Sequence, residues 1–241
     1  MGDGRTAREA ALSRTVRPFG APEGDLEDSS RTVRPFGGFS ALMKRRRMTR
    51  AFSPRPVEPE LLDSLLDTAR RVPSAGNSQG FDFLILSTSE AIERYWSTTF
   101  RPEARAGFEW QQLFEAPVLV VIYADSAAYV SRYSEPDKVR TGLGEGPQAW
   151  ATPYWLVDAS MAALALQLAA IDAGLGVLFF GVFDHADAVA SEFGVPSHRE
   201  VVGTVAIGYA ADTGGGDVVS AGRSSVRARR DLEEVVHRNN W

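Results

Sequence analysis

The hydrophobic positions between residues 59 and 125 follow two periods. From Pro59 to Arg71, one helical stripe collects Leu61, Leu62, Leu65, Leu66 and Ala69. This spacing predicts an amphipathic helix with a proline in its first turn. Phe81 to Ser87 and Pro117 to Asp125 are short aliphatic runs bounded by residues that break regular structure. Such runs predict strands in the interior of a sheet.

A longer segment, from Tyr154 to Ala173, is apolar on nearly every face. Its length approaches the roughly 20 residues that a membrane-spanning helix needs. Asp158, Gln167 and Asp172 interrupt it, and alanine outnumbers the larger aliphatic residues. We therefore predict a helix buried within the subunit or between two subunits, and no membrane span. Gly174 suits the left-handed position that follows a helix end.

The chain after this helix predicts two more strands with a helix between them. The strands are expected at Leu178 to Val182 and at Glu200 to Ala210. Between them, Asp184 can cap a helix that stops at Gly194 and Pro196.

Two short helices are predicted near the ends of the chain, from Ser40 to Arg47 and from about Asp231. The segments 95–116 and 131–153 show a less regular pattern. Strands separated by helices indicate an α/β or an α+β fold, and the order of the elements alone does not decide between them.

The first 38 residues differ from the rest. The octapeptide of residues 13–20 recurs without change at residues 30–37, with an acidic spacer between the copies. Two interpretations stay open: a disordered duplicated tail, or a pair of short motifs that dock on a scaffold or shell partner with avidity. We assign residues 1–38 to an arm and 39–241 to one folded domain, since a domain usually takes roughly 100–200 residues.

Composition narrows the classes of function. A net charge of −5 argues against a general nucleic-acid binder, which relies on a positive field. The absence of cysteine excludes disulfides, thiolate nucleophiles and cysteine-rich zinc sites. No apolar run of a secretory signal follows the first residues. We expect a cytoplasmic protein that binds neither nucleic acid nor membrane.

Two basic stretches and one small-residue stretch suggest a ligand. Arg45 to Arg50 and Arg223 to Arg230 are rich in arginine, and Pro73 to Gln79 contains small and amide residues. Guanidinium groups form forked hydrogen bonds with phosphate oxygens, and small residues let the backbone approach a flat polar ring. The candidate ligand is flavin mononucleotide (FMN).

Several motifs in this order resemble the FMN-dependent nitroreductase family. They are Arg46 to Phe52 followed by Pro56-Val57, then Ala69 to Gln79, the alanine-rich helix closing in Gly174-Leu175-Gly176, and Gly208-Tyr209. The resemblance extends from about residue 41 to the carboxyl terminus. It implies an α+β fold with a central, mostly antiparallel sheet flanked by helices. It also implies an intertwined homodimer with two FMN sites at the subunit interface.

The resemblance assigns roles to residues of the first basic stretch. Arg46 would hold the FMN phosphate, and Arg50 would lie by the pyrimidine edge of the ring, where a cation stabilises the reduced flavin. Many family members have serine where this chain has Met48, so a phosphate contact is lost. A backbone N–H or Arg47 would then compensate, or the affinity for FMN would be lower.

Further positions follow from the same resemblance. The segment that the partner subunit lays against the cofactor would contain Pro73, Ser74, Ala75, Asn77 and Gln79. Phe180 and Gly181 match the stretch whose backbone N–H faces flavin N5. Arg227 and Arg229 match a carboxyl-terminal pair that closes on the phosphate.

Aromatic and histidine residues receive weaker assignments. The variable region that covers the substrate in the family corresponds to segments containing Trp110, Phe114 and Trp150. We expect packing in the core or interface for Tyr154, Trp155 and Phe179. Metal or catalytic-triad roles are not expected, since neither ligand spacing nor a paired acid accompanies His185, His198 and His237.

The chemistry should therefore come from the cofactor. NADH or NADPH would pass a hydride to flavin N5 and leave, and an electron-poor acceptor such as a nitroaromatic or a quinone would take its place. No catalytic side chain is assigned. Two alternatives stay open: an enzyme of the same fold with other flavin chemistry, such as flavin consumption, dehalogenation or azoline oxidation, and a non-catalytic flavin-binding or scaffold-docked protein.

Overall fold

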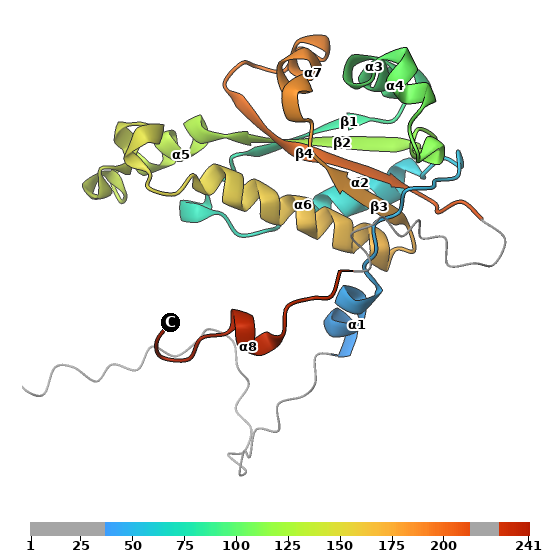
Figure 1. Ribbon diagram of the computed structural model, residues 1–241. Helices are drawn as coiled ribbons and strands as arrows, with labels where there is room; N and C mark the ends of the chain where they lie inside the picture. The colour runs from blue at the N-terminus through green and yellow to red at the C-terminus, as the bar shows by residue number, and fades with distance from the viewer. Residues whose placement is uncertain (1–36, 213–226) are drawn as a thin grey trace, which may run out of the picture. The chain divides into compact units, whose positions relative to one another are not determined.

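The computed structural model describes residues 37–212 and 227–241. A four-stranded sheet in the order β1-β2-β4-β3 forms the centre of the fold. Its strands are β1 (Phe81–Leu86), β2 (Val118–Asp125), β3 (Gly176–Phe180) and β4 (Arg199–Gly208), and every neighbouring pair is antiparallel. This sheet with its separate helices confirms the α+β class (Figure 1).

Strand β2 lies inside the sheet. It pairs with β1 from Phe81↔Ala124 to Leu86↔Leu119, and with β4 on its other side. All of its residues but the last are buried. This burial explains why the strand is apolar from Val118 to Ala124, because neither face is in contact with water.

Helices α2 (Pro59–Ala69) and α6 (Tyr154–Asp172) cover one face of the sheet (Figure 1). The core on this side joins leucines of α2 and alanines of α6 to valines and isoleucines of β2 and β4. The small alanine side chains allow α6 to approach the sheet closely along much of its length.

The opposite face is covered by α3 (Ser89–Thr99) and α7 (Ala186–Glu192), with α4 (Pro102–Ala106) close by (Figure 1). Its core is aromatic, with Tyr95 and Trp96 almost fully buried. The two cores lie on opposite faces of one sheet, as expected from a pleat that points alternate side chains to opposite sides.

Short elements complete the described chain. The helices are α1 (Gly37–Arg45), α5 (Ser126–Tyr133) and α8 (Leu232–Val235). Single 3-10 turns form η1 (Ala75–Asn77), η2 (Gln111–Leu113), η3 (Val139–Thr141), η4 (Leu143–Glu145), η5 (Pro147–Ala149) and η6 (Phe183–His185).

Several predicted boundaries are wrong. The first helix begins at Gly37, so Ser40 lies inside it and does not cap it. It ends at Arg45 instead of Arg47 because the chain then extends alongside β3. The third strand begins two residues earlier than predicted, since Gly176 pairs with Gly208. Asp184 does not cap α7: it lies in η6, and the helix begins after His185 without a side-chain cap.

Helices α3 and α5 were not predicted from the sequence, although each is preceded by a residue that caps its amino-terminal end. The side chain of Thr88 accepts a hydrogen bond from the N–H of Ala91, and Asp125 does the same for Ala127. Such bonds satisfy N–H groups that a helix start leaves without partners. The mixture of polar and aromatic residues hid the apolar stripe of both helices.

Helix α6 is the one helix in the described residues that is long and apolar enough to cross a membrane. It instead packs on the sheet, and Asp158 and Gln167 are buried on it. Gly174 follows with a φ of 82°, as predicted for the end of this helix. We interpret α6 as the core helix of the domain.

Some sequence predictions fall outside the described residues. They are the arm of residues 1–36, with both octapeptides except Gly37, and the arginine at position 223. The arm and its docking interpretation therefore remain predictions.

Candidate functional site

The basic segment after α1 follows the outer edge of β3. The N–H of Thr49 donates to the carbonyl of Val177 on β3 over 2.7 Å. The side chain of Thr49 lies over Gly176, where a Cβ would come within 2.6 Å of its Oγ1. Only glycine permits this approach. The segment therefore has a fixed path beside β3, from which Arg46 and Arg50 project.

The two arginines of the first basic stretch that the resemblance assigns to FMN, Arg46 and Arg50, are both half-buried. The guanidinium of Arg50 lies 4.7 Å from the ring centroid of Trp110, a cation–π distance. Arg47 differs from both, since its exposed guanidinium donates to the carbonyls of Lys44 and Arg46 over 2.6 and 3.0 Å. It thereby completes the end of α1.

Met48 points its side chain toward protein. It is partly buried against the aromatic core cluster that contains Phe52 and Leu178. A thioether fills an irregular apolar gap well but donates no hydrogen bond. The replacement of serine at this position therefore adds packing and offers no hydroxyl to a phosphate.

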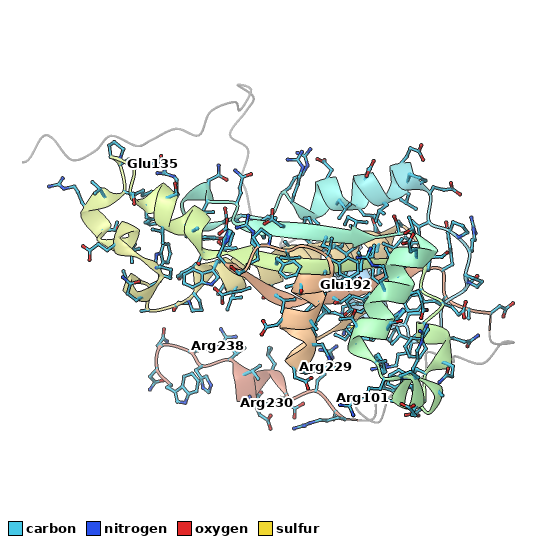
Figure 2. All side chains as sticks on the ribbon, turned by 90° about the horizontal axis from the view of Figure 1, so that it is seen from above. Arg101, Glu135, Glu192, Arg229, Arg230 and Arg238 are labelled. Carbon is cyan, nitrogen blue, oxygen red and sulfur yellow. The ribbon has the colours of Figure 1, made fainter. Side chains whose placement is uncertain are left out.

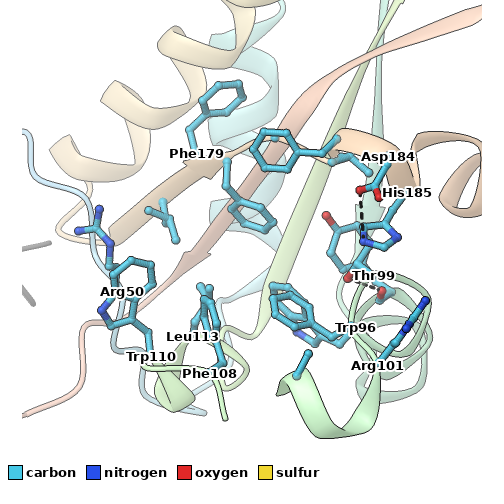
Figure 3. A pocket seen from close by; sticks show the side chains of 18 residues that line it. Arg50, Trp96, Thr99, Arg101, Phe108, Trp110, Leu113, Phe179, Asp184 and His185 are labelled. Carbon is cyan, nitrogen blue, oxygen red and sulfur yellow. Dashed lines mark hydrogen bonds and ion pairs between the residues drawn. The ribbon is translucent and has the colours of Figure 1, made fainter. Parts of the chain in front are cut away.

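A pocket of about 660 Å³ opens between the end of β3 and the α3–α4 corner (Figure 3). Arg50 and Trp110 lie at one end, and Thr99, Arg101, Asp184 and His185 at the other. Between the ends the wall is mostly aromatic and is formed by Tyr95, Trp96, Phe100, Phe108, Phe179, Phe180 and Phe183. Both the volume and the apolar lining are typical of a site for a small molecule.

The strand end at Phe180 and Gly181 forms one wall of this pocket. Phe180 stacks on Trp96 with 5.8 Å between ring centroids and 14° between the planes. The ring of Phe183 covers Gly181, since a Cβ there would lie 3.1 Å from it. Phe183 is itself 83% exposed and has a φ of 51°, which is unfavourable for a bulky residue. An exposed aromatic ring on a strained backbone makes Phe183 a candidate functional residue.

His185 has a neighbouring acid after all. Its Nε2 lies 3.6 Å from Oδ1 of Asp184, so the expectation that no acid accompanies this histidine is wrong. The hydroxyl groups of Thr204 and of Tyr95, another wall residue, form a 2.7 Å hydrogen bond. Burial raises the pKa of Tyr95, which keeps its phenol protonated at neutral pH.

The small-residue loop, Pro73 to Gln79, is held by its own backbone. The N–H of Gln79 donates to the hydroxyl of Ser74 over 2.9 Å, and the N–H of Asn77 donates to the carbonyl of the same serine. Gly76, Asn77 and Gln79 all have positive φ, of 62°, 57° and 51°. For the two non-glycine residues this conformation is costly and persists only where surrounding contacts enforce it.

Those contacts come from α5 and α6. Asp158, a buried carboxylate on α6, accepts hydrogen bonds from the N–H of Ala75 over 2.8 Å and from the hydroxyl of Tyr129 over 2.7 Å. Arg132 on α5 donates to the carbonyl of Gly76 over 2.9 Å. The acid that interrupts the apolar helix thus fixes the loop, because a buried carboxylate requires donors.

One chain does not bring the two predicted halves of the FMN site together. Asp158 holds the loop near the start of α6, whereas Asp172 at its end pairs with Arg45 of α1 over 3.2 Å. With a rise of 1.5 Å per residue, these two carboxylates are separated by about 21 Å along the helix. The loop and the 46–50 segment therefore lie toward opposite ends of α6.

The carboxyl-terminal pair, Arg227 and Arg229, is exposed. Figure 2 labels Arg229 of this pair. Neither lines the pocket described above. Arg230 of the same segment donates to the carboxylate of Glu234 over 3.2 Å. The assignment of this pair to the phosphate remains a prediction.

The aromatic predictions have mixed outcomes. Trp110 lines the pocket, as expected of a substrate-covering residue, whereas Trp150 is buried in the other core and donates to the carbonyl of Leu143. Trp155 packs in the core as predicted, and Phe179 packs against the same core while it also lines the pocket. Tyr154 is 43% exposed in the single chain, so its place in an interface stays a prediction. Sequence reasoning missed Arg101 and Phe183, since α3, α4 and η6 were not predicted.

The residues present fit FMN. The donors that a phosphate and a flavin ring require are available from Arg46 and Arg50, which lie four positions apart on one fixed segment. Gly176 and Gly181 keep the neighbouring strand free of side chains at two points of close contact. By contrast, no cluster of potential metal ligands occurs within residues 37–212 and 227–241.

Most of the chain matches the model of one protein family. The nitroreductase family model matches residues 43–209. The chain belongs to the nitroreductase family. Among the curated relatives of this nitroreductase-family chain is an NADH dehydrogenase of Thermus thermophilus, 29% identical over 70% of this chain and 85% of the relative. Another is a 5,6-dimethylbenzimidazole synthase of Rhodospirillum rubrum, 29% identical over 71% and 82%.

Solved structures share the fold. A nitroreductase family protein of Streptococcus pneumoniae superposes with a TM-score of 0.62 at 18% identity and covers 83% of this chain and 99% of its own. A protein of Exiguobacterium sibiricum, designated a nitroreductase and solved in complex with FMN, gives 0.62 at 21% identity, with coverage of 83% and 96%. This nitroreductase-family chain therefore has a nitroreductase fold within an oxidoreductase family.

Proposed function

We propose that this chain is an FMN-dependent NAD(P)H oxidoreductase that reduces an electron-poor acceptor such as a nitroaromatic or a quinone. The observation that carries the proposal is the placement of Arg50 at an aromatic pocket, on a segment that runs beside β3 and also contains Arg46. Family membership and a relative named NADH dehydrogenase support it.

Each of the proposed cofactor-binding residues would have a defined role. Arg46 would bind the phosphate with a charge-assisted contact worth about 1.5–3 kcal/mol. Arg50 would stabilise negative charge on the pyrimidine side of the ring, and the N–H of Gly181 would face N5. Bound FMN would supply a two-electron carrier that takes a hydride from NADH or NADPH and gives it to the acceptor.

The pocket would handle the two substrates in turn. Its aromatic wall suits a flat ring, whether a nicotinamide or an aromatic acceptor, and excludes much of the water. Because both would use the same place, turnover would be ping-pong. Solvent would supply the proton.

The proposal includes a homodimer. Tyr154, Val157 and Leu164 leave the outer face of α6 apolar, with exposures of 43%, 40% and 42%. A second copy would cover this face and lay its own 73–79 loop against the FMN of the first. Sharing of this kind accounts for the roughly 21 Å that separates the two halves along one helix.

Anaerobic reduction tests the proposal. The purified protein should bind FMN, show the visible absorbance of an oxidised flavin, and bleach rapidly with NADH or NADPH. Addition of a quinone or a nitroaromatic should restore the colour with a matching loss of acceptor. A protein that cannot be loaded with FMN, or whose flavin resists both nicotinamides, would contradict the proposal.

A second candidate is an enzyme of the same fold with other flavin chemistry. The relative named 5,6-dimethylbenzimidazole synthase favours it. The same assay separates the two candidates, because an oxidoreductase returns its FMN unchanged after many turnovers. Loss of FMN in proportion to turnover would favour the second candidate.

A further inference from the structure

The end of the pocket away from Arg50 has no role in the proposed cofactor site. Thr99, Arg101, Asp184 and His185 gather there (Figure 3). They come from the α3–α4 corner and from η6, which are distant in sequence. Polar groups that converge on an otherwise aromatic pocket are the usual means of orienting a ligand.

Arg101 differs from the arginines on either side of it. Arg94 pairs with Glu192 over 2.6 Å, and Arg105 pairs with Glu93 over 2.6 Å. Within the described part of the chain, the guanidinium of Arg101 forms no hydrogen bond and no ion pair. Its backbone is extended because α3 has ended and Pro102 begins α4. An arginine without a carboxylate partner beside an apolar pocket is suited to bind an anionic ligand.

The charges around this end favour an anion. Arg50 and Arg101 contribute two positive charges to the pocket, and Asp184 contributes one negative charge. The side chain of Asp184 is 88% exposed, so water and salt screen its repulsion of an anion. His185, whose side chain is 42% exposed, offers a ring N–H donor at the same end.

The shape of the pocket restricts the rest of the ligand. Phe100, Phe108 and Phe180 line the wall between the two ends, and Phe183 adds an exposed ring near His185. Flat aromatic rings stack favourably on such a wall. A ligand that satisfies both the wall and the cation is an aromatic ring with an anionic substituent.

We propose that Arg101 forms an anion subsite, supported by His185, that selects aromatic acceptors carrying a carboxylate. This inference rests on the proposed function, because it specifies the acceptor of the same pocket. Arg101 acts as a specificity residue, and the hydride chemistry does not depend on it.

Equilibrium binding to the FMN-loaded, oxidised protein provides the test. The probes are 4-nitrobenzoate and 4-nitrobenzamide, which share ring and nitro group and differ in charge. Quenching of tryptophan fluorescence reports binding, since Trp96 and Trp110 line the pocket. Arg101→Gln should weaken the binding of 4-nitrobenzoate about tenfold. This loss lies at the lower end of the range for a charge-assisted hydrogen bond, because the arginine is exposed. The benzamide should bind as before.

Two further variants sharpen the result. Arg101→Lys should restore part of the preference, since it keeps the charge and loses the planar fork. Arg140→Gln, at an exposed arginine in η3, should change neither affinity.

Equal effects of Arg101→Gln on both probes, or no effect, would overturn the anion subsite. The assay measures binding without a reductant. A protein that shows no preference for 4-nitrobenzoate over 4-nitrobenzamide would therefore leave the oxidoreductase proposal intact. Failure of NAD(P)H to bleach the flavin overturns that proposal and leaves the preference measurable.

Discussion

Single residues of this chain have roles that their type alone does not reveal. Asp158 interrupts an apolar helix and was recognised in the sequence only as an argument against a membrane span. In the fold it is 2% exposed and holds both Ala75 and Tyr129. A buried carboxylate must find donors, but which donors it finds depends on contacts between distant segments.

The bond between Tyr129 and Asp158 can be tested by its effect on stability. Tyr129→Phe should lower the free energy of unfolding by about 1.5–3 kcal/mol, since it removes a buried hydrogen bond to a charged group. Urea denaturation measures the change. Tyr133→Phe is the matched control, since within the described residues the Tyr133 hydroxyl forms no hydrogen bond, and it should cost less than about 0.5 kcal/mol. Equal losses in both variants would contradict the role of Asp158.

The same tyrosine predicts a loss of stability at high pH. Burial, and then the hydrogen bond to Asp158, raise the pKa of Tyr129 above its ordinary value of about 10. A raised pKa in the folded state stabilises the protein below the unfolded-state pKa, and this contribution declines as pH rises above it. Wild type should therefore lose stability above about pH 10, and Tyr129→Phe should lose less of it. If the free energy of unfolding fell equally with pH in wild type and in Tyr129→Phe, the contribution of Tyr129 would be contradicted.

At the scale of elements, the strongest periodic signals gave the best predictions. The helix with leucines at 61, 62, 65 and 66 and the long apolar helix were both found, and α+β was among the classes indicated. Helices α3 and α5 were missed because their stripes mix aromatic and polar residues, although Thr88 and Asp125 provide caps. An apolar run also does not reveal which face of α6 meets the sheet and which face is exposed.

The exposed face of α6 makes a prediction about assembly. Leu164→Glu should convert the proposed homodimer to a monomer, because twofold symmetry would bury two unpaired carboxylates and each costs several kcal/mol. Light scattering after size-exclusion chromatography measures the mass. Val139→Glu is the matched control, since Val139 is also apolar and is 56% exposed but belongs to η3. A dimer that survives Leu164→Glu would place the interface elsewhere.

At the scale of the whole molecule, the proposed site requires two chains. Arg46 lies beside β3, and Asn77 belongs to the loop that is fixed near the start of α6. If each FMN takes Arg46 from one copy and Asn77 from the other, mixing two damaged variants should restore function. This consequence does not follow for a site built from one chain.

A mixing experiment checks this arrangement. Arg46→Ala should weaken FMN binding about 10- to 100-fold, and Asn77→Asp should weaken it by placing a negative charge near the ring. Asparagine and aspartate both tolerate the left-handed backbone at this position, so the loop should keep its conformation. Refolded together, the variants should form mixed dimers with one intact and one doubly altered site. Recovery of tight FMN binding in the mixture, and in neither variant alone, is the expected result.

The sequence by itself determined the main elements, the fold class within two alternatives, and the resemblance to a family that comparison then confirmed. These depend on periodicity, caps and motifs, which act over a few residues. Only the tertiary structure decided that Asp158 holds the loop, that Arg101 and His185 share one end of a pocket, and that Met48 packs inward. The strand order β1-β2-β4-β3 brings distant segments together, and no local pattern encodes which of them meet.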